Sequence, residues 1–233
     1  MIESDFREWT LDKIDEAFGL LFVDSLPSLT GLVSFEYHAT ETEQVFLNKL
    51  SYKYRALGGE NWNEAELENK IISPLIVYSD IENKDFSYFL ERDLKATIGD
   101  YQLSGRVDGM IATGFRNPKL PFFCISEYKK AQDSNGDPQG QALIAMLVTQ
   151  HLNNNKNPVY GCYIVGRQWV FIALKGKKYT FSKSYTVDDD EIFDIYQILK
   201  SLKWHIEQMM KLKNPFQPLR KVRFRKVKRD ESP

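Results

Sequence analysis

The sequence predicts an α/β domain with a mixed central β-sheet flanked by helices. Three observations predict this class. Apolar residues recur at helical spacing before residue 75, strand-like segments follow from 86 to 130, and an apolar helix at 139–152 precedes further strands and a closing helix. No linker-like stretch interrupts residues 40–212, so one domain is expected rather than two.

The composition permits a sizeable core and leaves the partner open. Hydrophobic residues make up 42% and charged residues 27% of the 233 residues, and the formal net charge is -1. A balanced charge does not exclude nucleic acid, because clustered basic residues suffice to bind a polyanion. Cys124 and Cys162 lie in apolar runs and are expected to be buried free thiols in a reducing compartment. The two cysteines and three histidines are too scattered for a zinc site.

Nothing in the sequence predicts export or membrane insertion. The first residues, MIESDFREWT, have neither a basic start nor an apolar stretch of the signal-peptide type. No apolar run approaches the ~18 residues that a membrane span needs. We therefore expect a cytoplasmic protein without a membrane partner.

Residues 1–59 are predicted to be a helical region packed on the core. Residues 4–20 carry apolar side chains at mostly helical spacing, and Pro27 lies in the loop that follows. A second helix is expected over 41–57, and Gly58–Gly59 ends it in the manner usual for helix C-termini. The apolar face of the first helix consists of Phe6, Trp9, Ile14, Phe18 and Leu21.

A third helix is predicted to begin at Asn63. Asparagine is a favourable N-cap, and Glu66 stands three residues on, as a capping box requires. Pro74 is expected to kink or end this helix, because proline lacks the backbone N–H that the helix interior needs.

Three strands are predicted between residues 86 and 130. Residues 87–97 mix aromatic and aliphatic residues with charges, which is typical of an edge strand. Residues 101–111 form the second strand, and the turn-forming sequence FRNPK leads into the third, LPFFCISEY. The near-continuous apolar start of the third strand indicates burial on both faces.

The second half of the chain adds a helix and more strands. The apolar segment 139–152 predicts a helix, and 159–165 and 168–174 predict paired strands around the short turn Gly166–Arg167. Residues 177–187 add one or two strands.

The closing segment, 189–212, is predicted to be a long helix. Aspartates crowd its start and lysines its end, as the helix dipole favours. Its apolar stripe fits two arrangements, packing on the sheet or contact with a second copy in a homodimer. The stripe consists of Ile192, Ile195, Ile198, Leu199 and Leu202.

Residues 214–233 form a basic C-terminal tail. Seven residues after Pro215 are Lys or Arg. A solvated tail and an arm that contacts phosphates are both compatible with this composition. In the second case Arg223 and Arg225 are candidate nucleic-acid contacts.

The most informative pattern places acidic residues on neighbouring strands. Asp108 lies mid-strand in GRVDGMIA, and Glu127 and Lys129 end the next strand in FFCISEYKK. Side chains alternate along a strand, so Glu127 and Lys129 face the same side. If the two strands pair as a hairpin around FRNPK, Asp108 lies across from Glu127.

Two carboxylates and a lysine suit phosphodiester chemistry. Mg²⁺ takes one or two carboxylates plus waters, and the Tyr128 carbonyl is a further candidate oxygen ligand. A bound metal acidifies its water and stabilises charge on a phosphodiester. Lys129 is expected to orient or deprotonate the attacking water. An E-x-K triplet alone is usually a surface ion pair, but Asp108 stands in an apolar strand, where a buried acid needs a partner or a ligand.

The run from GRVDGMIA to SEYKK resembles the PD-(D/E)xK nuclease superfamily, which has the restriction endonuclease-like fold. It is similar to type I restriction enzyme R-subunit N-terminal domains and to bacterial proteins of the Bacteroides type. The resemblance covers about residues 60–175 and implies a core of order αβββαβ within residues 60–213, with extra N-terminal helices and a long C-terminal helix. Val107 stands where many relatives have proline.

The resemblance implies a wider site than the strand acids alone. The family often adds a glutamate from the first core helix, which implies Glu64 as a further catalytic residue and metal ligand, with Glu68 one turn on as second choice. The relatives often carry a glutamine in the helix after E-x-K, which implies Gln139 or Gln141. Arg106 flanks the site and is a weak candidate for phosphate contact, with a cross-strand ion pair as the alternative.

The expected function is therefore metal-dependent cleavage of DNA. The resemblance implies an endo- or exodeoxyribonuclease that uses Mg²⁺, with Mn²⁺ as a substitute. The alternative is a catalytically silent module of the same fold that binds nucleic acid or a protein partner.

Overall fold

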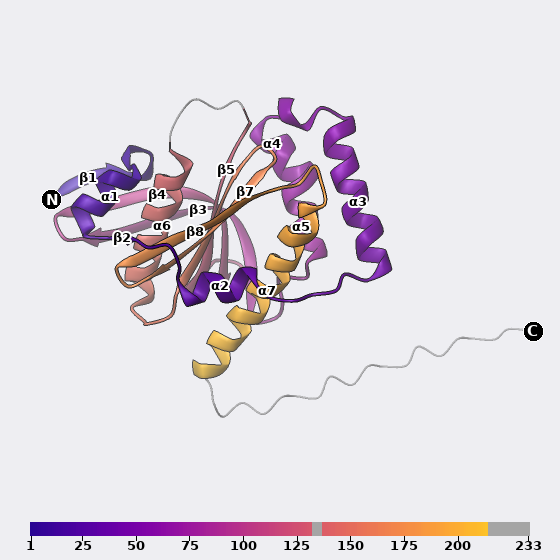
Figure 1. Cartoon of the computed structure of the whole chain (residues 1–233). Helices are drawn as coiled ribbons and strands as arrows, with labels where there is room; N and C mark the ends of the chain where they lie inside the picture. Colours follow the sequence, from indigo (N-terminus) through magenta and orange to yellow (C-terminus); the bar gives the residue numbers. More distant parts are fainter. Residues whose placement is uncertain (132–136, 214–233) are drawn as a thin grey trace, which may run out of the picture.

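Two long strands, β3 (Phe86–Ile98) and β4 (Tyr101–Thr113), form the antiparallel hairpin on which the sheet is built (Figure 1). The computed structural model of the chain describes residues 1–131 and 137–213. Within them one eight-stranded sheet has the order β1-β4-β5-β6-β7-β8-β2, and β3 pairs with β4 outside this path. The remaining strands are β1 (Ile2–Asp5), β2 (Leu21–Phe22), β5 (Lys119–Lys129), β6 (Val159–Val165), β7 (Gln168–Lys175) and β8 (Lys178–Thr186).

The sheet is mixed, as the sequence predicts. Strands β1 and β4, β5 and β6, and β2 and β8 pair in parallel, whereas the other neighbours are antiparallel. Helix α6 (Pro138–Asn153) joins the parallel pair β5 and β6, because a parallel connection needs a crossover. The predicted edge strand is confirmed, since among the described strands β3 pairs only with β4.

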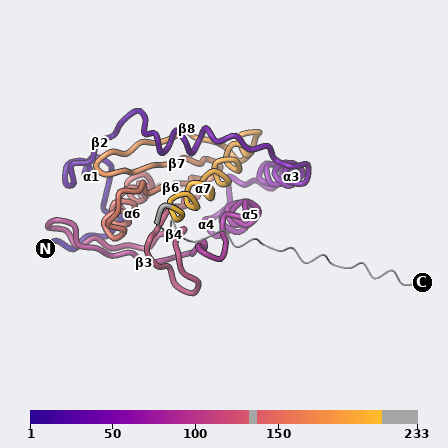
Figure 2. Tube along the Cα trace, turned by 90° about the horizontal axis from the view of Figure 1, so that it is seen from below, coloured from indigo at the N-terminus to yellow at the C-terminus, as the bar shows by residue number. Residues whose placement is uncertain are grey.

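Helices cover both faces of the sheet. Helix α6 and α1 (Leu11–Phe18) share one hydrophobic core with the sheet, and the other helices share a second core on the opposite face. Figure 2 shows α6 on one side and α3, α5 and α7 on the other. The helices of the second face are α2 (Pro27–Val33), α3 (Glu41–Ala56), α4 (Glu64–Leu67), α5 (Ser73–Tyr78) and α7 (Glu191–Lys213).

The N-terminal region is not wholly helical, which corrects the prediction for residues 1–59. Ile2–Asp5 pairs in parallel with residues 101–104 of β4, and Leu21–Phe22 pairs with β8. Both strands are short, and their partners lie about 100 residues or more away in the sequence. No local periodicity marks such segments, so the helical spacing of the neighbouring apolar residues dominates the prediction.

The helix before the hairpin begins as predicted but does not end at Pro74. Asn63 accepts a hydrogen bond from Glu66 N at 2.9 Å, and Glu66 Oε2 accepts one from Asn63 N, which completes the capping box. A π-helical segment, Glu68–Ile72, then leads directly into α5. Its wider turn lies directly before the proline, so the missing N–H and the ring of Pro74 are accommodated without ending the helix.

A partly buried glutamate ties the helices of the second face together. Glu43 on α3 accepts hydrogen bonds from Tyr37 and Tyr196, and Lys200 Nζ lies 3.3 Å from its Oε1. Burial acts against the charge, but the hydrogen bonds from Tyr196, Thr40 and Tyr37 outweigh it and lower the pKa of Glu43 to about 2. Because Tyr196 on α7 also reaches the Tyr78 carbonyl of α5, this cluster holds three helices in register.

The apolar stripe of α7 packs inside the chain. Ile192, Ile195, Ile198, Leu199 and Leu202 are all buried in the second core. The expectation of a homodimer through this stripe is therefore not supported. Among the described helices, none combines the length and hydropathy that a bilayer crossing requires.

Side-chain alternation along β4 breaks just before Asp108. Val107 and Met110 both belong to the core on the α6 face, although strict alternation would place residues three apart on opposite faces. Glu91, which lies opposite Asp108 in the β3–β4 register, has a positive φ of 48°. Both strands of the hairpin therefore depart from regular geometry at the level of Asp108.

Gly105 allows the N-terminal segment to lie flat against β4. A Cβ at this position would stand 2.3 Å from the ring of Phe6, which is 3% exposed. We expect Gly105→Ala to lower the free energy of unfolding by about 1–3 kcal/mol, because the ring must leave its place in the core. Chemical denaturation measures this change.

The matched control is Gly31→Ala in helix α2, where the nearest atom to an added Cβ is 3.4 Å away. Stability there should be unchanged or slightly higher, since alanine favours the helix. In a Phe6→Leu background the penalty of Gly105→Ala should shrink. An equal penalty in both backgrounds would show that the ring is not what excludes the side chain.

Candidate functional site

The candidate site lies where β5 leaves β4. Pairing between these strands extends to Gly109 opposite Ser126. Strand β1 pairs with residues 101–104, at the N-terminal end of β4. One step beyond the last pair, the same register places Asp108 across from Glu127, on one face of the sheet. We call this opening between β5 and β1 the β4 fork.

A side chain bridges the fork in place of a backbone ladder. Asp108 Oδ2 accepts a hydrogen bond of 2.5 Å from the backbone N–H of Tyr128. This bond fixes the carboxylate beside the strand that carries Glu127 and Lys129. The second carboxylate oxygen of Asp108 makes no hydrogen bond within residues 1–131 and 137–213.

Lys129 links the acidic residues of the site. Its Nζ lies 2.9 Å from Glu127 Oε1 and 3.8 Å from Glu64 Oε1, and it donates to the Tyr128 carbonyl at 3.1 Å. Glu64 reaches this position from the first turn of α4, directly after the Asn63 cap. Its side chain is 48% exposed, whereas those of Lys129 and Glu127 are largely buried. The structure thus brings all four sequence-predicted residues, Asp108, Glu127, Lys129 and Glu64, to one place.

A cavity of about 630 Å³ opens over these residues. We call it the site cavity. Strands β3 and β4, the end of β5, α6 and the N-terminal segment all contribute to its wall. It is lined by Asp5, Phe6, Arg7, Glu64, Glu91, Asp93, Leu94, Lys95, Ser104, Gly105, Arg106, Asp108, Glu127, Lys129 and Gln141.

Burial makes the carboxylates of the site reluctant to ionise. Desolvation raises the pKa of Asp108 to about 6, with Glu64 and Glu91 adding to the rise and Lys129 opposing it. Desolvation and the charge of Asp108 likewise raise the pKa of Glu127 to about 7. For Lys129, burial opposes the charge, but Glu127 and Asp108 outweigh it and raise the pKa of its ammonium group. Lys129 is therefore protonated at neutral pH.

Of the secondary acidic candidates, Glu68 lies near the site without lining the cavity. Burial and the charges of Glu91 and Asp108 raise its pKa, so it stands within electrostatic range of the strand acid. It begins the π-helical segment, one turn after Glu64.

The structure separates the two candidate glutamines. Gln141 is buried and lines the site cavity. The amide nitrogen of Gln139 donates to the Tyr163 hydroxyl at 3.0 Å, and Gln139 does not line the cavity. Both lie in the first turns of α6, and only the direction of each side chain distinguishes them.

Arg106 lines the cavity but is held in a cross-strand ion pair. Its guanidinium donates to both Asp93 oxygens, at 2.9 and 3.3 Å, and lies 3.7 Å from Glu91. Its predicted role as a weak phosphate contact therefore competes with this pair. Arg223 and Arg225, the other two predicted contacts, lie outside the described residues.

The donor chemistry of the site fits a hard divalent cation. Within residues 1–131 and 137–213, no three His, Cys, Asp or Glu side chains form a group that could hold a metal ion. Lys129 Nζ lies 2.9 Å from Glu127 and 3.8 Å from Glu64. Asp108, Glu127 and the Tyr128 carbonyl nevertheless offer oxygen atoms at the fork. Two carboxylates with a carbonyl and waters is a ligand set that Mg²⁺ accepts.

Sequence reasoning missed the contribution of the N-terminal segment. Asp5, Phe6 and Arg7 line the cavity because β1 joins β4 beside the fork. Lys95 and Glu91 of β3 line it as well. A glutamate in a strand gives no sign in the sequence that its backbone has a positive φ, as Glu91 does. The pairing of β1 joins segments too far apart in the sequence to be predicted from a local pattern.

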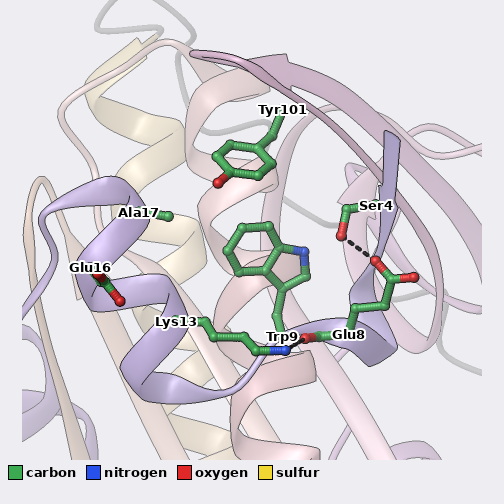
Figure 3. Close-up of a pocket in the computed structure, with 7 residues that line it drawn as sticks. All are labelled: Ser4, Glu8, Trp9, Lys13, Glu16, Ala17 and Tyr101. Atoms are coloured by element: carbon green, nitrogen blue, oxygen red, sulfur yellow. Dashed lines mark hydrogen bonds between the residues drawn. The ribbon is translucent and has the colours of Figure 1, made fainter. Parts of the chain in front are cut away.

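A second cavity, of about 430 Å³, lies beside the N-terminal segment and is built differently. Ser4 and Asp5 point to opposite sides of β1, so Ser4 lines this cavity and Asp5 the site cavity. Figure 3 shows Trp9 and Tyr101 as its aromatic wall and Lys13 reaching the Glu8 carbonyl, at 2.7 Å. Glu8, Glu16 and Lys13 also line it, but among the described residues no ion pair joins these three side chains.

Comparison with solved structures shows a weak likeness. The chain matches no protein-family model and no curated protein. A similar solved structure is described as "cryoEM structure DrdV-DNA complex", with 13% sequence identity and a TM-score of 0.39. The match covers 74% of this chain and 14% of that chain, so this chain spans a small part of that protein. At this TM-score the likeness does not define the fold.

The raised carboxyl pKa values predict an unusual pH dependence of stability. A carboxyl group whose pKa is raised on folding favours the folded state most at pH values below its unfolded pKa, near 4.5. This stability is lost as the pH rises through the folded pKa, which is about 7 for Glu127. Glu127→Gln removes this penalty. Without divalent metal, we expect it to raise the free energy of unfolding by about 1–3 kcal/mol at pH 8 and by little at pH 5.

Thermal unfolding in EDTA at both pH values measures the effect. The control is Glu36→Gln, which alters an exposed glutamate away from the site cavity. If Glu127→Gln lowers the stability at pH 8 relative to this control, the ion pair with Lys129 outweighs the cost of burial. The pKa of Glu127 is then not raised on folding.

Proposed function

We propose that this chain is a metal-dependent nuclease of the PD-(D/E)xK type that hydrolyses phosphodiester bonds of DNA. The observation that carries the proposal is the convergence of Asp108, Glu127 and Lys129 at the β4 fork, with the Tyr128 carbonyl beside them. The element order α5, β3, β4, β5, α6, β6 also follows the αβββαβ order of the restriction endonuclease-like core.

The residues divide into ligands and a charged donor. Asp108, Glu127 and the Tyr128 carbonyl would hold Mg²⁺, and Glu64 lies on the outer side of Lys129. When bound, Mg²⁺ supplies an acidified water and stabilises negative charge on the phosphate. The binding of a cation also resolves the electrostatic problem of the site, because two buried carboxylates then face a positive charge.

Lys129 acts in this proposal as a protonated donor. Its raised pKa keeps the ammonium group charged at neutral pH, which disfavours its use as a general base. The ammonium can orient a water and stabilise the developing charge of the phosphoryl group. Gln141, whose buried side chain lines the cavity, can hold the same water through its amide.

The test is cleavage of supercoiled, linear duplex and single-stranded DNA with Mg²⁺ or Mn²⁺. We expect Asp108→Asn and Lys129→Ala each to reduce the rate by about 10²-fold or more, because each removes a ligand or a charge from the reacting position. Asp100→Asn, an exposed acid in the β3–β4 turn, is the matched control and should retain full activity.

Metal dependence and mutant sensitivity must agree for the proposal to stand. Equal residual cleavage by wild type, Asp108→Asn and Lys129→Ala would identify a contaminating nuclease and remove the enzymatic assignment. Thermal unfolding of each variant checks that lost activity does not reflect lost folding.

A silent module that binds nucleic acid or a protein partner is the second candidate. The observation that favours it is that Lys129 already pairs with Glu127 and approaches Glu64, while no three His, Cys, Asp or Glu side chains among the described residues form a group that could hold a metal ion. Calorimetric titration with Mn²⁺ separates the two. We expect wild type to bind the metal and Glu127→Ala to lose binding. No binding by wild type at any pH would favour the silent module.

A further inference from the structure

The N-terminal segment presents a guanidinium to the site cavity from a fixed backbone. Asp5 accepts a hydrogen bond from Arg7 N at 3.0 Å, which caps the 3-10 helix η1 (Phe6–Glu8). On one side of Arg7 the ring of Phe6 is buried against Gly105, and Trp9 is buried in the same core. The backbone at Arg7 is therefore anchored at both ends, whereas its own side chain is exposed and lines the cavity.

Most charges around the cavity neutralise one another. Four cations line it, and two of them are engaged, Lys129 with Glu127 and Glu64, and Arg106 with Asp93 and Glu91. Across residues 1–131 and 137–213, the side chain of Arg7 makes no hydrogen bond or ion pair, and neither does that of Lys95. These two cations remain available to an incoming anion.

Of the two available cations, Arg7 follows the strand that runs toward the reacting groups. Strand β1 is parallel to β4 and ends with Asp5 opposite Ser104, so Arg7 comes next in the direction of Asp108, whereas Lys95 pairs with Ser104 itself. An arginine also offers planar, bidentate donors that match phosphate oxygens, which a lysine does not. A phosphate chain entering a cavity lined by six acidic residues needs such a donor to offset repulsion.

We propose that Arg7 forms a phosphate-binding subsite that receives a backbone phosphate of the substrate next to the Asp108 and Lys129 centre. This inference rests on the proposed function for its substrate class. It also gives β1 and η1 a role, since their pairing with β4 fixes the guanidinium beside the fork. The ligand chemistry is a phosphodiester of a nucleic-acid backbone, recognised without reading of base identity.

The test compares Arg7→Gln, Arg7→Lys and Lys13→Gln in the full chain. Lys13 is the matched control, because it lies on the same segment but donates to the Glu8 carbonyl beside the second cavity (Figure 3). Binding of a fluorescein-labelled DNA duplex is measured by anisotropy in EDTA over a range of KCl concentrations, and cleavage of the same duplex is measured with Mg²⁺.

We expect Arg7→Gln to reduce the slope of log Kd against log salt by about one, because one phosphate contact is lost. The KM for cleavage should rise with kcat little changed, since the contact is present in substrate and transition state alike. Arg7→Lys should recover the salt slope but only part of the affinity, and Lys13→Gln should match wild type. The unfolding midpoint should not move in any variant, which excludes a merely structural role.

The outcomes separate this inference from the nuclease proposal. Wild-type cleavage with an unchanged salt slope and KM in Arg7→Gln would overturn the subsite and leave the nuclease proposal standing. Arg7-dependent DNA binding without any cleavage would support the subsite and contradict the enzymatic assignment. If wild type neither binds nor cleaves the duplex, the subsite proposal is overturned, and the nuclease proposal then depends on the supercoiled and single-stranded substrates.

Discussion

The arrangement of this chain depends on how one edge of β4 is shared. Strand β5 pairs with its C-terminal part and β1 with its N-terminal part, on the same side. Between them the backbone ladder is interrupted, and the bond from Tyr128 N to the Asp108 carboxylate takes its place. A polar side chain rather than a backbone carbonyl therefore meets the departing strand, which is why an acidic residue can occupy the middle of a strand that packs on the core.

The fork concentrates charge where the fold would otherwise be apolar. Glu127 is nearly as buried as the core residues around it, and burial raises the pKa values of both strand acids. Lys129 offsets only part of this penalty. Sites that act on substrates commonly retain such locally unfavourable arrangements, because the same charges become favourable once a ligand of opposite sign is present. The positive φ of Glu91 and the break in alternation before Asp108 add strain at the same level.

The surrounding fold stabilises this region from several directions. Glu43 and its tyrosine partners hold α3, α5 and α7 together, and α4 follows the same helical layer into the site through Glu64. On the other face α6 brings Gln141, and the N-terminal segment brings Arg7. Elements from the N-terminal segment to α6 thus contribute to one cavity, and the sheet fixes their mutual positions.

The features of this protein that could be predicted from its sequence are those that arise from short-range geometry. The two-residue period of a strand places Glu127 and Lys129 on one face, and the Asn63 and Glu66 pair specifies a helix start. The composition and order of segments also predicted a mixed sheet between helices. These properties depend on neighbours within a few residues.

The groups that reach the site from distant parts of the sequence are brought there by tertiary packing. Parallel pairing of Ile2–Asp5 with β4 brings together segments about 100 residues apart, and no local pattern encodes that contact. The direction of Gln141 into the cavity and of Gln139 toward Tyr163 depends on how α6 packs on the sheet. The physical reason is that such contacts are selected by the burial of whole surfaces against one another, a property of the assembled layers that single segments do not contain.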